Sequence, residues 1–188
     1  MRKKAGSILV FIFFVLGLFA CGLWLSKYVA IHEEAQALLQ TFGYAGIVAI
    51  SFFSGLNIAI PIHAGVFVPM YEAAGFPLLW IIVSMVIGTS LADLVGYAIG
   101  NLGHAHAKVA ESPLLKKIID YCKVHTHLLI PLLFLWVAII PLPNELVVIP
   151  LALFGVSFLP MFAALIAGNV VHLTAVAFGI SAISNFVQ

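Results

Sequence analysis

The chain has 188 residues, of which 64% are hydrophobic and 8% are charged. A core of this size cannot bury so much apolar surface, so the composition excludes an ordinary soluble protein and predicts an integral membrane protein. The net charge of +1 gives no overall attraction to nucleic acid, and the two cysteines, Cys21 and Cys122, form no paired-cysteine metal or redox motif.

The N-terminal element is an apolar stretch over residues 8–25 that follows basic residues at positions 2–4. A cleaved signal peptide has a shorter apolar region, so the length favours a signal-anchor transmembrane helix within residues 1–30. A lipoprotein cleavage box around Cys21 is a weaker alternative, because the apolar run continues past it. The basic residues predict a cytoplasmic N-terminus.

The next unit, over residues 31–103, begins with apolar residues at helical spacing, which predicts an amphipathic helix along the membrane interface. An apolar run follows, and Asn57, Pro61 and His63 interrupt it near its centre. A longer apolar span completes the unit. The interfacial helix, the interrupted run and the span are expected over residues 31–42, 46–75 and 78–102.

A second unit, over residues 112–184, repeats this order of elements. Its interrupted run contains Pro141, Pro143 and Asn144, followed directly by Glu145. Proline and polar residues are costly in hydrocarbon unless the broken backbone is buried in protein or lines a wet cavity. The interfacial helix, the interrupted run and the span are expected over residues 112–123, 128–155 and 159–183.

The two units are predicted to be an inverted repeat of amphipathic helix, re-entrant hairpin and transmembrane helix in an all-α membrane protein. Each leg beside a break has roughly 12 to 15 residues, or about 20 Å of helix, which is too short to cross ~30 Å of hydrocarbon. Each unit then crosses the membrane once, so its second copy is inverted. At a spacing of eighty, Pro61 matches Pro141, Gly75 matches Gly155 and Gly88 matches Gly168.

The loop between the units carries four lysines, at positions 108, 116, 117 and 123. Cytoplasmic loops are enriched in lysine and arginine, so this loop is expected on the same side as the N-terminus. Two segments on the same side of a membrane are separated by an even number of crossings. The N-terminal helix and the span over residues 78–102 supply two.

The spacing of Gly88, Asp93, Tyr97, Gly100 and Gly103 resembles the span motif of the DedA family, also called the VTT or SNARE-associated membrane proteins. The segment from Asn57 to Pro61 is similar to that family's hairpin motif. The resemblance covers roughly residues 30 to 184. It implies a membrane domain over residues 31–184 in the cell membrane of a prokaryote, and a role in moving or scrambling lipids, including phospholipids and undecaprenyl phosphate, or in proton-linked membrane homeostasis.

The chain departs from that family's pattern at both breaks. Leu56 and Gly65 stand where the first hairpin of the family has acids, and Ala138 and Asn144 stand where the second has arginines. Arginine is the side chain best suited to gripping phosphate, so these departures weaken the case for a polyprenyl phosphate substrate.

Six residues are candidates for substrate or proton binding: Asp93, Glu145, His63, Asn57, Asn144 and Tyr97. Asp93 lies deep in a span, where an ionised carboxylate must be paired, hydrated or protonated. Tyr97, one helical turn further on, is its expected partner. If the tips of the two hairpins meet, Asn57, His63 and Asn144 form one polar group with Glu145. The simpler alternative is that these side chains only satisfy broken backbone.

The sequence therefore predicts a membrane transporter or lipid scramblase, coupled to protons through Asp93 and Glu145. The alternative is a non-transporting membrane scaffold whose polar tips hold its helices together. No enzyme activity, cofactor, metal or nucleic-acid partner is expected, although two His-x-His pairs, at residues 104–106 and 125–127, leave a zinc or nickel site open. Membrane lipids and protons are the expected partners, and a homo-oligomer is compatible with the sequence.

Overall fold

The computed structural model describes residues 24–56, 64–106, 124–140 and 142–187, together with positions 17, 20, 21, 117 and 120–122. Most of the expected N-terminal helix and of the second interfacial helix therefore lies outside the described residues, as do Asn57, Pro61 and His63 at the first break and Pro141 at the second. Within the described residues the structure is helical and contains no strand. The all-helical fold expected from the sequence is confirmed at this level.

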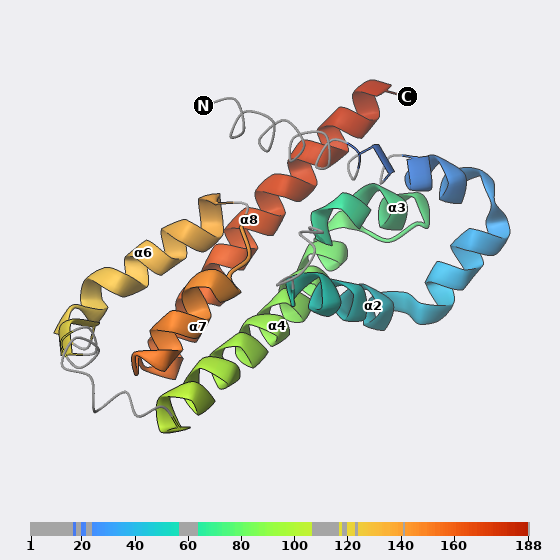
Figure 1. The fold of residues 1–188 in the computed structure, drawn as a ribbon. Coiled ribbons are helices and arrows are strands. Elements are labelled where there is room, and N and C mark those ends of the chain that lie inside the picture. The colour runs from blue at the N-terminus through green and yellow to red at the C-terminus, as the bar shows by residue number, and fades with distance from the viewer. Residues whose placement is uncertain are drawn as a thin grey trace, which may run out of the picture.

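Two long helices, α4 and α8, contact each other, and shorter helices flank them on either side (Figure 1). α4 also packs against α2 and α7, while α8 also packs against α6 and α3. The elements in chain order are α2 (Glu33–Gly55), the short 3-10 helix η1 (Ala64–Phe67), α3 (Val68–Ala73), α4 (Leu78–His106), α6 (Thr126–Ile139), α7 (Glu145–Leu153) and α8 (Phe158–Val187).

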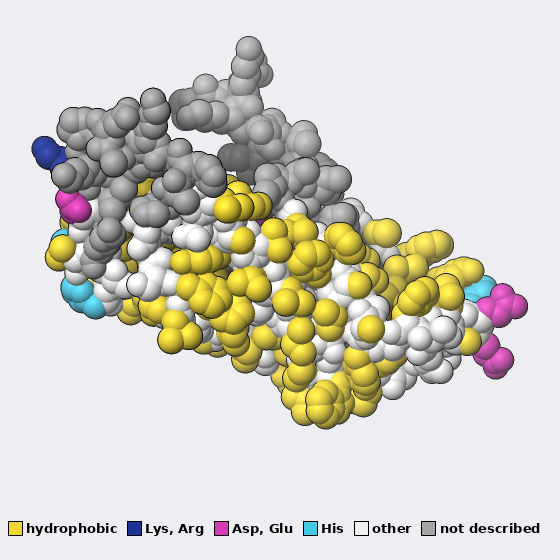
Figure 2. Space-filling model, turned by 90° about the horizontal axis from the view of Figure 1, so that it is seen from below, with side chains coloured by type: hydrophobic (Ala, Val, Ile, Leu, Met, Phe, Trp, Pro, Cys, Tyr) yellow, Lys and Arg dark blue, Asp and Glu magenta, His cyan; other side chains and the backbone are white. Residues whose placement is uncertain are grey.

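Three of these helices are long and apolar enough to cross a membrane: Glu33–Gly55, Leu78–Gly103 and Phe158–Gly179. Their outward faces carry large apolar side chains such as Phe53, Trp80 and Leu159. Figure 2 shows hydrophobic side chains over the middle of one face, with acidic and histidine side chains at its two ends. An apolar belt between polar ends is the surface expected of a membrane protein.

α2 is broken at Gly43, whose φ of 54° and ψ of −150° lie outside the helical region. Glycine adopts this conformation because it has no Cβ to clash with the backbone. The break falls between the interfacial helix expected over residues 31–42 and the apolar run expected from residue 46. α2 therefore consists of two helical segments, before and after Gly43, that run in different directions (Figure 1).

The turns that lead into α4 and α8 are built alike. Gly75 and Gly155 both have positive φ, at 89° and 79°, and both stand just past the end of a helix. Each turn has the pair of backbone hydrogen bonds that defines a Schellman motif. They are Gly75 N to Glu72 O and Phe76 N to Tyr71 O in the first turn, and Gly155 N to Ala152 O and Val156 N to Leu151 O in the second.

Two further glycines, again eighty residues apart, allow close helix crossings. A Cβ on Gly88 of α4 would lie 2.4 Å from the backbone oxygen of Val48 on α2. A Cβ on Gly168 of α8 would lie 2.7 Å from the Cβ of Val137 on α6. Without a hydrophobic effect between helices in lipid, such close packing is a main source of helix association.

Candidate functional site

The second interrupted run breaks where the sequence predicts it. α6 ends at Ile139, and Ile140 is extended, with φ −92° and ψ 120°. α7 then begins at Glu145, so Asn144 and Glu145 stand together at the start of a new helix. Pro143 precedes them and lacks a backbone N–H, so it cannot donate the hydrogen bond that would continue the helix.

The side chain of Asn144 joins two other polar side chains in the interior. Its Nδ2 donates to Asp93 Oδ1 of α4 at 3.0 Å and to Asn169 Oδ1 of α8 at 3.2 Å. Asn169 Nδ2 in turn donates to Asp93 Oδ2 at 2.7 Å. The three side chains form a closed ring of hydrogen bonds that connects α4, α8 and the start of α7.

Asn144 occupies the N-cap position of α7 but makes no side-chain hydrogen bond to that helix. Asparagine is among the best N-cap residues because its side-chain oxygen accepts from the first free N–H groups, which stabilises a helix by about 1 kcal/mol. Here the side chain is directed to Asp93 and Asn169 instead. The position therefore gives up local helix stability for a contact between helices.

Glu145 is also buried, with 4% of its surface exposed, and Asp93 is only 2% exposed. No other described residue forms a hydrogen bond with either carboxyl oxygen of Glu145. The side chain packs beside Gly96 of α4, where a Cβ would lie 3.4 Å from Glu145 Cγ, and it interacts electrostatically with Asp93. We call Asp93, Asn144, Glu145 and Asn169 the polar cluster.

Two buried carboxyl groups in one cluster cannot both carry a charge without a large penalty, since the described helices around them supply no lysine or arginine. The described helices α2, α4, α6, α7 and α8 contain no lysine or arginine. An unpaired charge in a medium of low dielectric constant is costly, and two like charges add repulsion. The arrangement is suited to holding one proton between the two acids.

Two other titratable groups in these helices have their own partners. Tyr97 donates from its hydroxyl to the backbone oxygen of Val156, at 3.4 Å, and its ring packs on Phe158. The expected hydrogen bond from Tyr97 to Asp93 is therefore replaced by one to the turn before α8. The Nδ1 atom of His172, on α8, lies 3.3 Å from the backbone oxygen of Ala138.

The structure thus brings three of the candidate residues together, Asp93, Asn144 and Glu145. The predicted contributions of Asn57 and His63 from the first break lie outside the described residues. Asn169 is a member that the sequence analysis did not include. The signal that could have identified Asn169 is its place in the middle of an apolar span, directly after Gly168, which matches Gly88 at a spacing of eighty.

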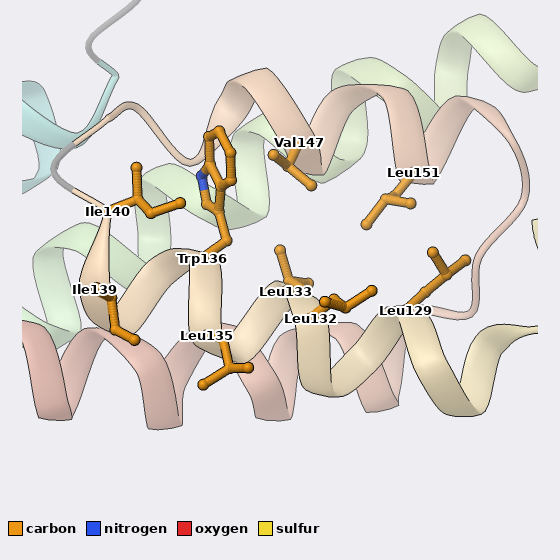
Figure 3. A pocket seen from close by; sticks show the side chains of 9 residues that line it. All are labelled: Leu129, Leu132, Leu133, Leu135, Trp136, Ile139, Ile140, Val147 and Leu151. Atoms are coloured by element: carbon orange, nitrogen blue, oxygen red, sulfur yellow. The ribbon is translucent and has the colours of Figure 1, made fainter.

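An apolar groove of about 370 Å³ lies between α6 and α7. Trp136 and Leu133 on α6 point towards Val147 and Leu151 on α7 (Figure 3). The indole nitrogen of Trp136 is buried without a hydrogen-bond partner among the described residues. The groove extends to Ile140, close in sequence to the polar cluster.

The described residues contain no group of three or more histidine, cysteine, aspartate or glutamate side chains that could hold a metal ion. The side chains of His104 and His106 are outside the described set. In comparisons with known proteins, no family model, curated protein or solved structure matches the chain. The resemblance to the DedA family remains a prediction from the sequence motifs.

Proposed function

We propose that the chain is a proton-coupled membrane transporter or lipid scramblase of the DedA type, with the polar cluster as its proton site. The observation that carries this proposal is Glu145, a buried acid at a helix break that makes no side-chain hydrogen bond to any other described residue. A purely structural acid is normally satisfied by hydrogen bonds, and ionisable residues inside membranes mark proton and substrate pathways.

We further propose that the two units form an inverted repeat. In support, α4 contacts α2 and α7 in the way that α8 contacts α6 and α3, and the two long helices contact each other. The Schellman turns and the close glycine crossings recur at a spacing of eighty residues. Inverted repeats of this kind underlie alternating access in many transporters.

The helices beside the breaks support a re-entrant arrangement. At about 1.5 Å per residue, the part of α2 after Gly43 extends about 18 Å, and α6, with 14 residues, extends about 21 Å. Both are shorter than the ~30 Å hydrocarbon core. Hairpins that enter the membrane and return, with Asn144 and Glu145 at one tip, account for these lengths.

For location and orientation, we propose the plasma membrane of a prokaryote with the N-terminus in the cytoplasm. The basic N-terminus and the four lysines of the central loop support this orientation. Lipids are the proposed substrates, because the groove between α6 and α7 is apolar along its length. The described membrane helices offer no arginine to a phosphate, which weakens the case for a polyprenyl phosphate.

Purified protein in lipid vesicles tests this function. We expect wild-type protein to speed both the exchange of a fluorescent phospholipid between leaflets and the movement of protons. Glu145→Gln and Asp93→Asn should slow both, whereas Glu34→Gln, which removes an exposed acid from the start of α2, should not. Equal rates in vesicles with and without wild-type protein would contradict the proposal.

A non-transporting scaffold is the second candidate, and one observation favours it. Both oxygens of Asp93 accept hydrogen bonds, from Asn144 and Asn169, so this acid ties three helices together. A scaffold would need Asp93 for its stability and would not need Glu145. Loss of folding in Asp93→Asn together with no vesicle activity in the wild type would identify the scaffold.

A further inference from the structure

The two acids of the polar cluster have unequal surroundings. Asp93 accepts one amide hydrogen bond on each oxygen, while Glu145 has no partner among the described residues. We propose that Asn144 and Asn169 are positioning residues that hold Asp93 as the ionised member of the pair, so that Glu145 is the acid that takes up and releases the proton. This inference rests on the proposed function and assigns roles within its proton site.

The orientation of the two amides carries the argument. An ionised carboxylate only accepts hydrogen bonds, whereas a protonated one also donates. A proton on either oxygen of Asp93 would remove that oxygen's negative charge and so weaken the hydrogen bond that the oxygen accepts from Asn144 or Asn169. Which end of an amide is nitrogen is assigned from its hydrogen bonds, so the whole ring must be considered.

The ring opposes such a turn. Asn169 Oδ1 accepts from Asn144 Nδ2 while Asn169 Nδ2 donates to Asp93. Turning Asn169 over would place its NH2 group against the NH2 group of Asn144, and the bond between them would be lost. Turning both amides over would keep the bond between them, but it would set two amide oxygens against Asp93, which has at most one proton to donate. The orientation in which both amides donate to Asp93 is therefore the one that satisfies every member of the ring. Hydrogen bonds donated to the charged form of an acid favour that form.

Glu145 has the opposite surroundings. Its carboxyl group is buried, faces the charge of Asp93 and receives no side-chain hydrogen bond from a described residue. Ionisation at this position would add a second negative charge without compensation. A proton binds to one carboxyl oxygen of Glu145 and leaves from the same group, so Asp93 keeps its charge and its two bonds throughout.

The other titratable side chains that the structure describes on the packed helices do not replace these roles. Tyr97 on α4 donates to the turn before α8, and His172 on α8 contacts the backbone of Ala138 on α6. On α2 and α3 the titratable side chains are Glu33, Glu34, Tyr44, Tyr71 and Glu72, and on α6 the only one is His127 at its start. The acids of the polar cluster are the only two acids on α4, α7 and α8.

Infrared difference spectroscopy of the full-length protein in lipid tests the assignment, because a protonated carboxyl group gives its own C=O band. We expect a buried carboxylic-acid band at neutral pH that Glu145→Gln removes and Asp93→Asn retains. We expect Asn169→Leu to add a second band, which the double variant Asp93→Asn/Asn169→Leu lacks. Asn101→Leu, a change of an exposed asparagine on α4, should leave the spectrum unchanged.

A wild-type band that disappears in Asp93→Asn rather than in Glu145→Gln would overturn the proposal, as would the absence of any such band. An unchanged spectrum in Asn169→Leu would show that the amides do not set the charge of Asp93. If circular dichroism shows that Asn169→Leu has not folded, Asn144→Ala removes the bond to the other oxygen and gives the same test. These spectra do not depend on transport, so a failure of this inference is distinct from a lack of flux in vesicles.

Discussion

The polar cluster and the region eighty residues away from it pack similar helices with very different side chains. At that spacing Asp93 corresponds to Leu173, Glu145 to Gly65, Asn144 to Ala64 and Asn169 to Thr89. Ala64 and Leu173 are each 3% exposed and belong to one apolar cluster. We call these four positions the apolar counterpart.

The apolar counterpart shows that this packing does not require polar residues. Thr89, its one hydrogen-bonding side chain, donates to Met85 of its own helix rather than to another element. Helix crossings near both regions depend on small residues at the same spacing, Gly88 and Gly168. Close glycine packing therefore occurs near both regions, whereas the buried acids that the structure describes occur only in the polar cluster, to which each unit contributes one.

The largest expected effect tests the close helix crossings at glycine, which occur near both regions. Gly88→Leu and Gly168→Leu should each destabilise the protein by about 3 kcal/mol or more, because the new side chain meets tightly packed atoms. Thermal unfolding in detergent, followed by circular dichroism, measures the loss. Gly179→Leu is the control on α8, since a Cβ there meets nothing within 4 Å. Equal stability of all three variants would remove the proposed role of the glycines.

The next effect concerns Glu145, an acid that the apolar counterpart lacks. Glu145→Gln should slow proton movement in vesicles about a hundredfold, the lower end of what a positioned proton-transfer group contributes. Its melting temperature should stay close to that of the wild type, because Glu145 makes no side-chain hydrogen bond within the described residues. A variant that melts early and transports at the wild-type rate would reverse this assignment.

A third prediction converts the polar cluster towards its apolar counterpart. Asp93→Leu alone leaves the amides of Asn144 and Asn169 without their acceptor, so it should cost about 1–3 kcal/mol. The triple variant Asp93→Leu/Asn144→Ala/Asn169→Thr also removes those amides and should recover most of this loss. Chemical unfolding in mixed micelles compares the two. A triple variant less stable than the single one would show that the polar cluster is needed for packing.

The smallest effect tests the equivalence of the two turns. Gly75→Ala and Gly155→Ala each force a side chain into a left-handed conformation and should cost about 1–2 kcal/mol. The two losses should agree within the error of a thermal melt, because the turns share one hydrogen-bond pattern. A loss in only one variant would mean that the turns are not equivalent.

Long apolar runs made much of the fold predictable. The spans expected over residues 78–102 and 159–183 are the helices α4 (Leu78–His106) and α8 (Phe158–Val187). The break before Glu145 was also predictable, because Pro141 and Pro143 stand close together there, whereas the single prolines Pro131 and Pro150 lie within α6 and α7. These features depend on local sequence alone.

The partners inside the site were less predictable, since they depend on tertiary packing. Asn169 and Asp93 are separated by 76 positions, and no periodicity links them. Tyr97 shares a helix face with Asp93, yet its hydroxyl reaches Val156 because the turn before α8 lies against α4. Asn144 stands at the start of α7, but its side chain contacts α4 and α8, and the sequence does not show that these two helices lie beside it.

The central claim, that Glu145 couples proton movement to transport, is tested most directly by imposing a pH gradient across protein-containing vesicles and following leaflet exchange of a fluorescent phospholipid. The account predicts that the gradient changes the exchange rate with wild-type protein and with Glu34→Gln, and has no effect with Glu145→Gln. An exchange rate that responds to the gradient equally in Glu145→Gln and wild-type protein would contradict it.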